Sequence, residues 1–193
     1  MCGADYLCDS EEEVGIVIRS RVKLFVGMLS AAEELFAEAE KKLVWHFGEI
    51  DFGSEPVLFT HTDHYEREMG KGLLRRFVSF RELVDAGSLA EMKIFTRWIE
   101  GQFAGASGNR RINIDPGYIS GAKVVLATTK NYDHRVYLGG GIYAEVTLHY
   151  RGGSFRAWDW TYPDYRTEKY IGMFNKIRRL YMDQAGSGKK AEQ

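Results

Sequence analysis

The order of short apolar runs and helical repeats along the chain is the sequence feature that most limits its fold. In chain order these segments are the run 22–26, the repeat 35–47, the runs 57–59 and 74–80, the repeat 92–103 and the run 111–114. Short runs rich in β-branched and aromatic residues are typical of strands, whereas apolar residues spaced by three or four positions are typical of helices. The order strand, helix, strand, strand, helix, strand predicts an α+β domain with a ferredoxin-like, or split βαβ, core.

Serine and glutamate residues predict where the two helices begin. Ser30 with Glu33, and Ser88 with Glu91, have the spacing of a capping box, in which each side chain accepts a hydrogen bond from a free backbone N–H at the start of a helix. Gly48 directly follows the first repeat, and glycine commonly ends a helix. We therefore expect two capped helices in this part of the chain.

The second part of the chain predicts an antiparallel β meander and a C-terminal helix. The strand-like runs and the glycine turns between them are 136–138, 139–141, 142–150, 152–153 and 155–160. The run Ile119 to Thr128 is too short for periodicity to separate a buried strand from a short helix, and we favour a helix. From Thr167 onward, apolar residues recur on one face of a final helix.

The two ends of the chain differ in composition from the segment between them. Residues 1–21 are acidic, and residues 186–193 contain no large apolar side chain. We therefore expect a flexible leader and a disordered tail on either side of a single domain at 22–185. The only two cysteines, Cys2 and Cys8, lie in the leader, and two are too few for a disulfide scaffold or a zinc knuckle. Free thiols are the expectation.

Charge and hydropathy argue against several classes of protein. A formal net charge of -1 gives no overall attraction to a polyanion, so nucleic acid is not indicated as a partner. The acidic leader is the reverse of a basic signal peptide, and no run approaches the roughly 20 apolar residues that a membrane span requires. The sequence therefore predicts a cytoplasmic protein that is not inserted in a membrane.

Four longer motifs together resemble one family of bacterial and archaeal proteins. They are Glu68-Met69-Gly70, Asn113 to Tyr118, Gly141 to Leu148 and Trp160 to Arg166. A chain with these motifs in this order is similar to the family of domain of unknown function 4416 (DUF4416), with the resemblance running from about Lys23 to Tyr181. It implies a family and no activity, so it transfers no catalytic or binding residue to this chain.

The polar segment from Thr60 to Glu68 is a candidate metal site. His61, Asp63 and Glu68 supply imidazole and carboxylate groups, which are the ligands that transition metals prefer. The spacing of a metalloprotease motif is absent, and a solvated loop explains the same residues. A metal at these three residues is therefore the weaker of the two interpretations, and the sequence leaves any cofactor unknown.

The motif Asp115-Pro116-Gly117-Tyr118 reads as a tight corner at the end of a strand. Proline fixes φ and glycine permits a positive φ, so a type II turn explains both residues. Asp115 could cap its own backbone at the start of that turn, or it could act as a functional carboxylate. We retain Asp115 as a candidate catalytic residue.

Basic residues recur near the ends of the predicted strands. If the fold brings Lys130, His134 and Arg135 close to Arg75 or Arg76, they form a pocket for phosphate or carboxylate, because arginine binds such groups in a planar, bidentate way. Scattered surface charge is the alternative. The glycine run 139–141 lacks the lysine and hydroxyl residue of a nucleotide-binding P-loop, so it does not indicate a GTPase.

Two further acidic positions complete the candidate site. Glu145 falls on the polar face of its strand, where it could take part in acid–base chemistry or form an ordinary cross-strand ion pair. Asp164 and Arg166 lie among Trp158, Trp160 and neighbouring tyrosines in a rigid segment of the kind that lines ligand pockets.

These residues predict a small-molecule site for an anionic or nucleotide-like ligand, because functional groups gather at strand ends and turns. The candidate catalytic residues are Asp115, His134 and Glu145, and the candidate ligand-binding residues are Arg76, Lys130, Arg135, Asp164 and Arg166. The sequence leaves open whether the protein is an enzyme or a binder.

Two other interpretations of the sequence come from different classes. In the first, an open sheet face presents Tyr137, Tyr143, Trp158 and Trp160 to RNA or to a protein partner. In the second, the chain forms a homo-oligomer through an unpaired edge of its sheet.

Overall fold

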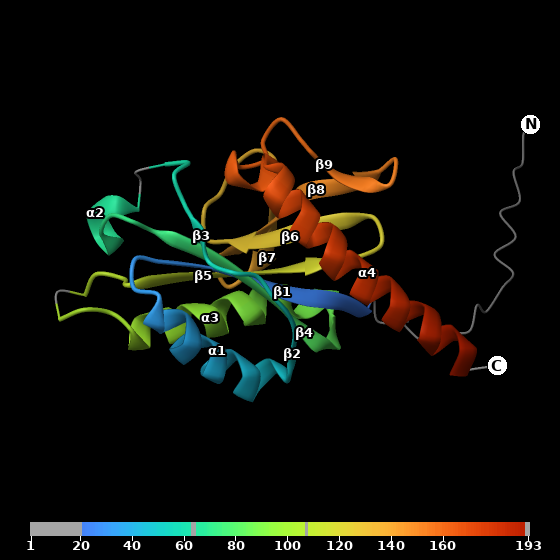
Figure 1. The fold of residues 1–193 in the computed structure, drawn as a ribbon, viewed down its shortest axis with the longest axis horizontal. Helices are drawn as coiled ribbons and strands as arrows, with labels where there is room; N and C mark the ends of the chain where they lie inside the picture. Colours follow the sequence, from blue (N-terminus) through green and yellow to red (C-terminus); the bar gives the residue numbers. More distant parts are fainter. Residues whose placement is uncertain (1–20, 63–64, 107, 192–193) are drawn as a thin grey trace, which may run out of the picture.

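The computed structural model describes residues 21–62, 65–106 and 108–191 and places them around one large sheet (Figure 1). The strands are β1 (Arg21–Ser30), β2 (Ile50–Gly53), β3 (Val57–Leu58), β4 (Leu74–Asp85), β5 (Ile112–Ile119), β6 (Lys123–Thr128), β7 (Val136–Gly139), β8 (Ile142–Arg151) and β9 (Ser154–Ala157). The helices are α1 (Glu34–Phe47), α2 (Glu66–Met69), α3 (Leu89–Gln102) and α4 (Glu168–Ala191), with 3₁₀ turns at Ala86–Ser88 and Asp164–Arg166.

The described strands form a single antiparallel sheet. Their order is β2-β4-β1-β5-β6-β8-β7, with β3 paired to β4 and β9 paired to β8. All the pairings described in this sheet are antiparallel. The predicted α+β class is therefore confirmed as a mixed fold with a mostly antiparallel open sheet and helices.

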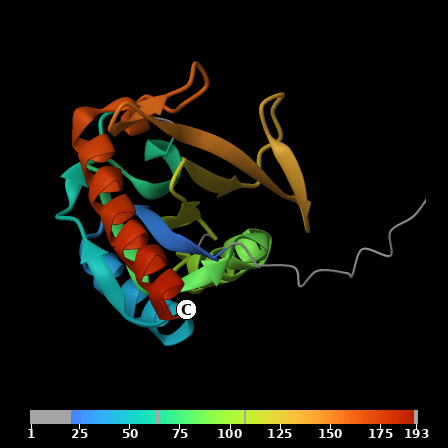
Figure 2. The ribbon, with the colours of Figure 1, turned by 90° about the vertical axis from the view of Figure 1, so that its right-hand side faces the viewer.

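Each face of the sheet carries its own apolar core. Successive strand residues point to opposite faces, so in β1 the side chains of Leu24 and Val26 join a core beneath α1 and α3, whereas Phe25 joins a core beneath α4. In the second core Phe174 packs against Phe25 and Phe77, with ring centroids 5.2 Å away in each case. Figures 1 and 2 show α4 crossing the sheet apart from α1 and α3.

The predicted capping boxes are wrong, although both helices exist. Helix α1 begins at Glu34 and α3 at Leu89, and neither has a side-chain hydrogen bond at its N-cap. Ser30 is the last residue of β1, where its hydroxyl donates to the carbonyl of Arg111 and accepts from the N–H of Ala32. Pairing with β4 and β5 extends the strand through the serine, and this overrides the local capping signal.

The predicted corner at Asp115 to Tyr118 is also wrong, because β5 runs straight through it. Gly117 pairs with Phe25 of β1 and with Leu126 of β6. A Cβ atom there would lie 2.5 Å from the carbonyl oxygen of Val125 and 2.7 Å from the Phe25 ring. The glycine therefore permits close packing between strands rather than a positive φ. Pro116 sits where pairing with β6 stops, so its missing N–H disrupts no bond on that side.

The run Ile119 to Thr128 is two strand segments rather than the expected helix. β6 lies between β5 and β8 and pairs with both. Val124 and Leu126 enter the core beneath α4, whereas Val125 and Ala127 pack on the opposite face with Leu89 of α3. Burial on both faces gives a continuous apolar run, which hides the period-two alternation of a strand. Strand β2 was not predicted at all.

The predicted meander is confirmed, and its glycine turns adopt the required conformation. β7, β8 and β9 are consecutive antiparallel strands, and the glycines at 139–141 and 152–153 all have positive φ. Helix α4 reaches Ala191, so it continues through most of the segment from residue 186 for which the sequence predicts disorder. The leader with Cys2 and Cys8, apart from Arg21, lies outside the described residues. None of the described helices is long and apolar enough to cross a membrane.

Candidate functional site

The sheet opens between β5 and β6, and a pocket lies in that opening. These two strands pair only where Gly117–Ile119 meets Val124–Leu126. Towards the start of β5 the backbone of Ile114 turns to α3 instead: its N–H donates to Glu100 Oε1 at 2.6 Å, and its carbonyl accepts from Lys93 Nζ at 2.9 Å. The side chains of Glu100 and Lys93 thus make the hydrogen bonds to the Ile114 backbone that a neighbouring strand would otherwise make.

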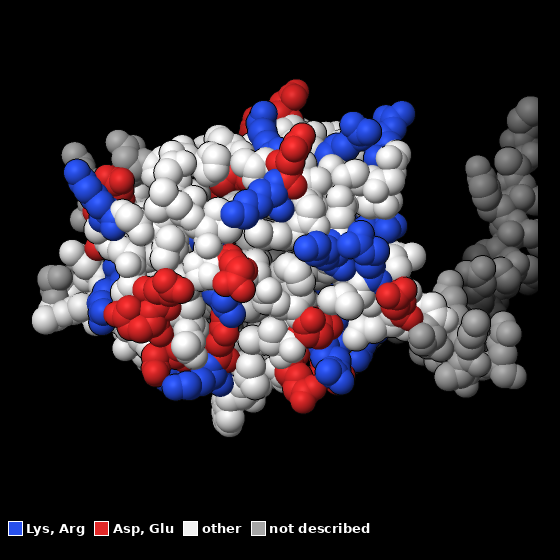
Figure 3. Space-filling view, viewed as in Figure 1, with Lys and Arg blue, Asp and Glu red and all other residues white. Residues whose placement is uncertain are grey.

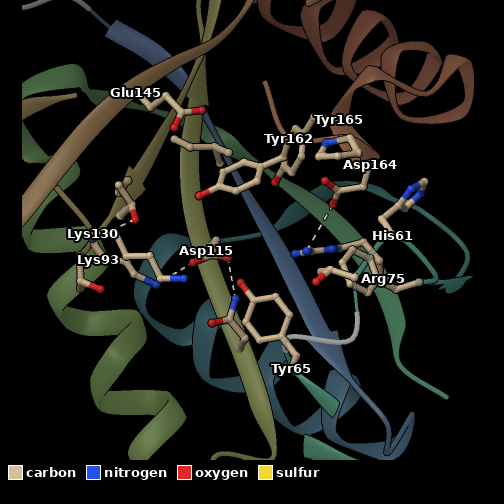
Figure 4. A pocket seen from close by; sticks show the side chains of 18 of the residues that line it. His61, Tyr65, Arg75, Lys93, Asp115, Lys130, Glu145, Tyr162, Asp164 and Tyr165 are labelled. Atoms are coloured by element: carbon tan, nitrogen blue, oxygen red, sulfur yellow. Dashed lines mark hydrogen bonds and ion pairs between the residues drawn. The ribbon is translucent and has the colours of Figure 1, made fainter. Parts of the chain in front are cut away.

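The pocket has a volume of about 550 Å³ and is lined by residues from both faces of the sheet. This size is in the usual range for small-molecule sites. Its charged or titratable lining residues are His61, Tyr65, Arg75, Lys93, Arg97, Glu100, Arg110, Asp115, Lys130, Tyr132, Glu145, Tyr162, Asp164 and Tyr165. In Figure 4, Asp115 lies between Lys93 and Tyr65, with Arg75 and Asp164 on the far side.

Asp115 is an ionised carboxylate at the centre of the pocket. Its Oδ1 accepts from Lys93 Nζ at 2.8 Å, and its Oδ2 accepts from Asn113 Nδ2 at 2.5 Å. Burial by itself favours the neutral form, but the Lys93 charge and hydrogen bond hold the pKa of Asp115 below its ordinary value. The side chain remains 27% exposed, so a ligand in the pocket can reach it.

Glu100 is the second carboxylate near Lys93, at a distance of 3.6 Å from the ammonium. Burial raises the pKa of Glu100, and the neighbouring Lys93 opposes that increase only in part. The two carboxylates around one lysine therefore have pKa values displaced in opposite directions.

Arg75 is a buried cation with too few hydrogen-bond acceptors. The residue is 4% exposed, and its Nε and Nη1 atoms have no close hydrogen-bond partner among the described residues, although the hydroxyl of Tyr170 lies near the guanidinium and acts on it. Nη2 contacts Asp164 Oδ2 at 3.5 Å, which is long for a charged hydrogen bond. The guanidinium lies 5.2 Å from the ring centroid of Phe59. Burial opposes its charge, but Tyr165 and Asp164 hold the pKa of Arg75 above its ordinary value, so it stays charged.

Asp164 lies on the pocket wall across from Asp115, and its pKa is shifted in the opposite direction. Burial raises the pKa of Asp164, while the positive charge of Arg75 opposes the increase. The carboxyl group lies on the 3₁₀ turn Asp164–Arg166, next to the buried Tyr165. A carboxyl with a raised pKa at a pocket wall can exchange a proton closer to neutral pH than an exposed aspartate can.

Two tyrosine side chains, Tyr65 and Tyr162, lie on either side of Asp115 (Figure 4). Burial raises the pKa of Tyr65 to about 12, and the charge of Asp115 acts in the same direction. Burial also raises the pKa of Tyr162. Both phenols are therefore protonated at neutral pH and can donate hydrogen bonds.

A buried ion pair supports the wall of the pocket formed by residues 129–135. Arg135 Nε donates to Glu145 Oε2 at 2.9 Å, and the same guanidinium donates to the Lys130 carbonyl and to the Tyr162 hydroxyl. His134 Nε2 lies 3.2 Å from the same Glu145 oxygen. The observed contacts of Glu145 are thus those of an ion pair, which was one of the two interpretations of this residue. Arg135 and His134 do not line the pocket, and they support the residues that do.

The fold brings together some of the predicted site residues and separates others. Asp115, Lys130, Glu145, Asp164 and His61 line the pocket. Arg76 lies on the opposite face of β4, where it pairs with Glu40 of α1 at 2.5 Å. Arg166 donates to the carbonyls of Thr161 and Asp159 and does not line the pocket.

The predicted metal ligands do not form a metal site in the part of the chain that the structure describes. Glu68 makes a two-point ion pair with Arg110, with distances of 2.8 and 2.7 Å. His61 lines the pocket, and Asp63 lies outside the described residues. The described residues contain no group of three or more His, Cys, Asp or Glu side chains arranged to hold a metal ion.

Sequence reasoning left Arg75 and Arg76 as alternatives, included only Arg76 among the ligand-binding candidates, and did not identify Lys93. Arg75 and Arg76 are adjacent, and only the direction of alternation along β4 decides which of them faces the pocket. The sequence does not give that direction, because Phe77 on the face of Arg75 and Val78 on the face of Arg76 both belong to apolar cores. Lys93 follows Leu89 by four residues and Glu100 follows Thr96 by four, and this helical spacing is the signal that could have placed both charges on the buried face of α3.

A column of aromatic rings extends from the pocket over the meander. Trp160 stacks on Trp158 with centroids 5.1 Å apart and on His134 at 5.6 Å, and His134 stacks on Tyr132 at 6.0 Å. Tyr132 lines the pocket, so the column connects the pocket to the sheet face on which the sequence predicts exposed tryptophans.

Comparisons with known proteins show one relationship. No curated protein and no solved structure matches this chain. The model of a family described as a domain of unknown function (DUF4416) matches residues 20–181, which include every residue described above as lining the pocket. The resemblance carried by the four sequence motifs is thus confirmed, and the chain belongs to the DUF4416 family.

Proposed function

We propose that this protein binds an anionic small molecule in the pocket between β5 and β6. The observation that carries the proposal is Arg75, a fully charged guanidinium that is 4% exposed, lines the pocket and has two donor nitrogens without an acceptor among the described residues. Buried donors without partners are costly, and an anion that supplies acceptors offsets this cost.

Other cations of the pocket support the same assignment. Lys130 and Arg97 line the pocket together with Arg75. Lys93 also lines it, and its positive charge is paired with two carboxylates, Asp115 and Glu100. Arg135 holds the backbone of Lys130 in place through its carbonyl. We assign Arg75 and Lys130 to ligand binding, Asp115 and Asp164 to contacts with the ligand, and Glu145, His134 and Arg135 to positioning of the wall.

The test compares two neighbouring arginines with the same substitution. Calorimetric titration of the purified chain with sulfate and inorganic phosphate should show saturable binding, and Arg75→Lys should weaken it at least tenfold because lysine cannot reproduce the planar guanidinium. Arg76→Lys is the matched control, since Arg76 faces α1 on the other side of the sheet. Equal binding by the Arg75 variant, or no binding of either anion, would contradict the proposal.

The RNA-binding alternative has less support from the aromatic residues. Base stacking requires a free ring face, whereas Trp160 already stacks on both Trp158 and His134. Acidic and basic side chains are interspersed over the face shown in Figure 3. Tyr137 is exposed and pairs with Tyr143 at 5.2 Å, so these two tyrosines are the remaining candidates. Retention of single-stranded RNA in a filter-binding assay, lost with Tyr137→Ala, would favour the alternative.

We also propose that the first part of the chain is a ferredoxin-like unit. The strand order β2-β4-β1-β5 supports this assignment, because β4 lies between β1 and β2 while β1 lies between β4 and β5. The unit β1-α1-β2 therefore has β4 inserted between its two strands, and the unit β4-α3-β5 has β1 inserted between its two strands, as in a split βαβ arrangement. An experimental structure compared with ferredoxin-like proteins would test it.

A further inference from the structure

Acidic and basic groups alternate across the pocket, and this alternation restricts what the ligand can be. Arg75 lies beside Asp164, and Asp115 lies between Arg75 and Lys93 (Figure 4). A ligand that is anionic along its whole length would place negative charge against both aspartates. We therefore expect the anionic part of the ligand at Arg75, away from Asp115, and hydrogen-bond donors on the part next to Asp115.

The environment of Asp115 favours neutral donors over a cation. An ionised carboxylate offers about four acceptor positions, and Lys93 and Asn113 occupy one on each oxygen. Positions remain for ligand donors, since the side chain is 27% exposed. A ligand ammonium would meet the charges of Lys93 and Arg75, which already act on this carboxylate. Hydroxyl groups meet no such repulsion.

The aromatic lining fits a ligand with a carbon ring or chain that carries hydroxyls. Tyr65 and Tyr162 flank Asp115 in Figure 4, and each combines an apolar ring with a hydroxyl. Phe59 adds an apolar surface next to the guanidinium of Arg75. The pocket therefore offers apolar contact along its walls and polar groups at defined points.

We propose that the ligand is an anionic polyol, a sugar or sugar-like molecule with one phosphate or carboxylate, whose anionic group lies at Arg75 and whose hydroxyls bind Asp115. This inference rests on the proposed function and narrows it to a ligand class. The phosphate and carboxylate forms both present anionic oxygens to Arg75, and they differ in charge, geometry and number of acceptor oxygens.

The experiment compares ligands on the unaltered full chain. Calorimetry or ligand-observed NMR would measure binding of a panel of pentose, hexose and inositol phosphates and of sugar acids. The reference anions are inorganic phosphate, hexyl phosphate and hexanoate, which carry the same anionic groups without hydroxyls on the carbon chain. We expect at least one polyol anion to bind tenfold or more tightly than its reference, and the two arms of the panel identify phosphate or carboxylate.

Variants then assign the two recognition points. Asp115→Asn should reduce the preference for the polyol anion to within about threefold of its reference, because the ionised acceptor for the hydroxyls is lost. Arg75→Lys should weaken binding of the polyol anion and of its reference alike. If every reference anion binds as tightly as its polyol partner, this inference is wrong and the proposed function stands. If no anion in the panel binds, both are wrong. The ligand comparison decides the inference even if the Asp115 variant is unstable.

Discussion

At the scale of single residues, Lys93 shows how strongly this protein depends on one buried cation. Its ammonium contacts Asp115, Glu100 and the carbonyl of Ile114. The contact with Ile114 replaces a hydrogen bond that a neighbouring strand would make to β5, and the contact with Asp115 positions the central carboxylate of the pocket. Stability and ligand binding are therefore coupled at this residue.

Asp115→Asn should lower the free energy of unfolding by about 1.5–3 kcal/mol at pH 7, because Lys93 loses a charged acceptor. The folded pKa of Asp115 is depressed, so its stabilising contribution is present above the unfolded pKa of about 3.9 and is lost as pH falls through the folded value. Urea unfolding at pH 7 and at lower pH should show the difference between wild type and variant shrinking below about pH 4. Asp159→Asn, at an exposed position, is the control. A difference independent of pH would contradict this account.

Gly117→Ala should destabilise the protein by about 3 kcal/mol, the upper part of the range for overpacked cores. The added methyl group would meet the carbonyl of Val125 at 2.5 Å and the ring of Phe25 at 2.7 Å. Gly121→Ala is the matched control, since its methyl group would meet only Met182 Sδ at 3.5 Å. Thermal and urea unfolding of both variants would measure the difference. Similar stability of the two would show that the strands can separate at Gly117 without cost.

Anion binding should strengthen as pH falls, because Asp164 becomes neutral next to Arg75. Burial raises the folded pKa of Asp164, so protonation begins above the pH range of an exposed aspartate and removes the negative charge that competes with a bound anion. Sulfate is the suitable probe, since its charge is constant from pH 8 to pH 5. Asp164→Asn should bind sulfate several-fold more tightly at pH 7 and lose most of the pH dependence.

His61 also lines the pocket and acts on Asp164, so the contribution of this side chain has to be separated from that of the carboxyl group. The titration is therefore repeated with His61→Gln. Other titratable groups near Asp164 are Tyr165 and Tyr170, which stay protonated over this range because burial raises the pKa of both phenols. A pH dependence that disappears in the His61 variant and persists in Asp164→Asn would assign the effect to the histidine.

At the scale of secondary-structure elements, α4 is the element that closes the second core. Phe174 packs against Phe25, Phe77 and Tyr165 with centroid distances of 5.2, 5.2 and 5.5 Å. Tyr165 lies on the pocket wall, so α4 supports the site through this contact.

Phe174→Ala should lower the free energy of unfolding by about 3–5 kcal/mol, because it removes a fully buried ring and leaves a cavity. Met182→Ala, on the same helix but 43% exposed, should change it by less than about 1 kcal/mol. Urea unfolding monitored by circular dichroism measures both. A small loss at Phe174 would mean that α4 is not needed to hold the sheet together.

At the scale of the whole molecule, both cores are built on the same strands. β1 places Leu24 and Val26 in one core and Phe25 in the other, and β4 divides Val78 and Phe77 in the same way. Neither core can lose its packing without exposing a strand that the other requires.

We therefore expect one cooperative unfolding transition for the described domain. Far-UV circular dichroism and tryptophan fluorescence should give coincident urea curves. Fluorescence can be separated by region, since Trp45 and Trp98 lie on α1 and α3, and Trp158 and Trp160 follow β9. A double replacement of either pair by phenylalanine leaves one reporter region. Two transitions with different midpoints would show that the regions unfold independently.

The sequence by itself determined the family, the mixed α+β class, the two helices before Gly105, the glycine-turned meander and the final helix. Periodicity and turn residues are properties of single segments, so they can be read without knowing what each segment contacts. The sequence also identified Asp115, Lys130, Glu145 and Asp164 as candidate site residues, and these line the pocket.

Only the tertiary structure decided where the sheet opens and which cations face the opening. Whether Asp115 to Tyr118 bends or continues as a strand depends on β1 and β6, which lie far away in the sequence. The choice of Arg75 over Arg76 depends on which face α4 covers. Lys93 and Glu100 acquire their roles only because β5 lacks a strand partner beside them among the described residues. Each of these features is a contact between distant segments, and a local pattern contains no information about it.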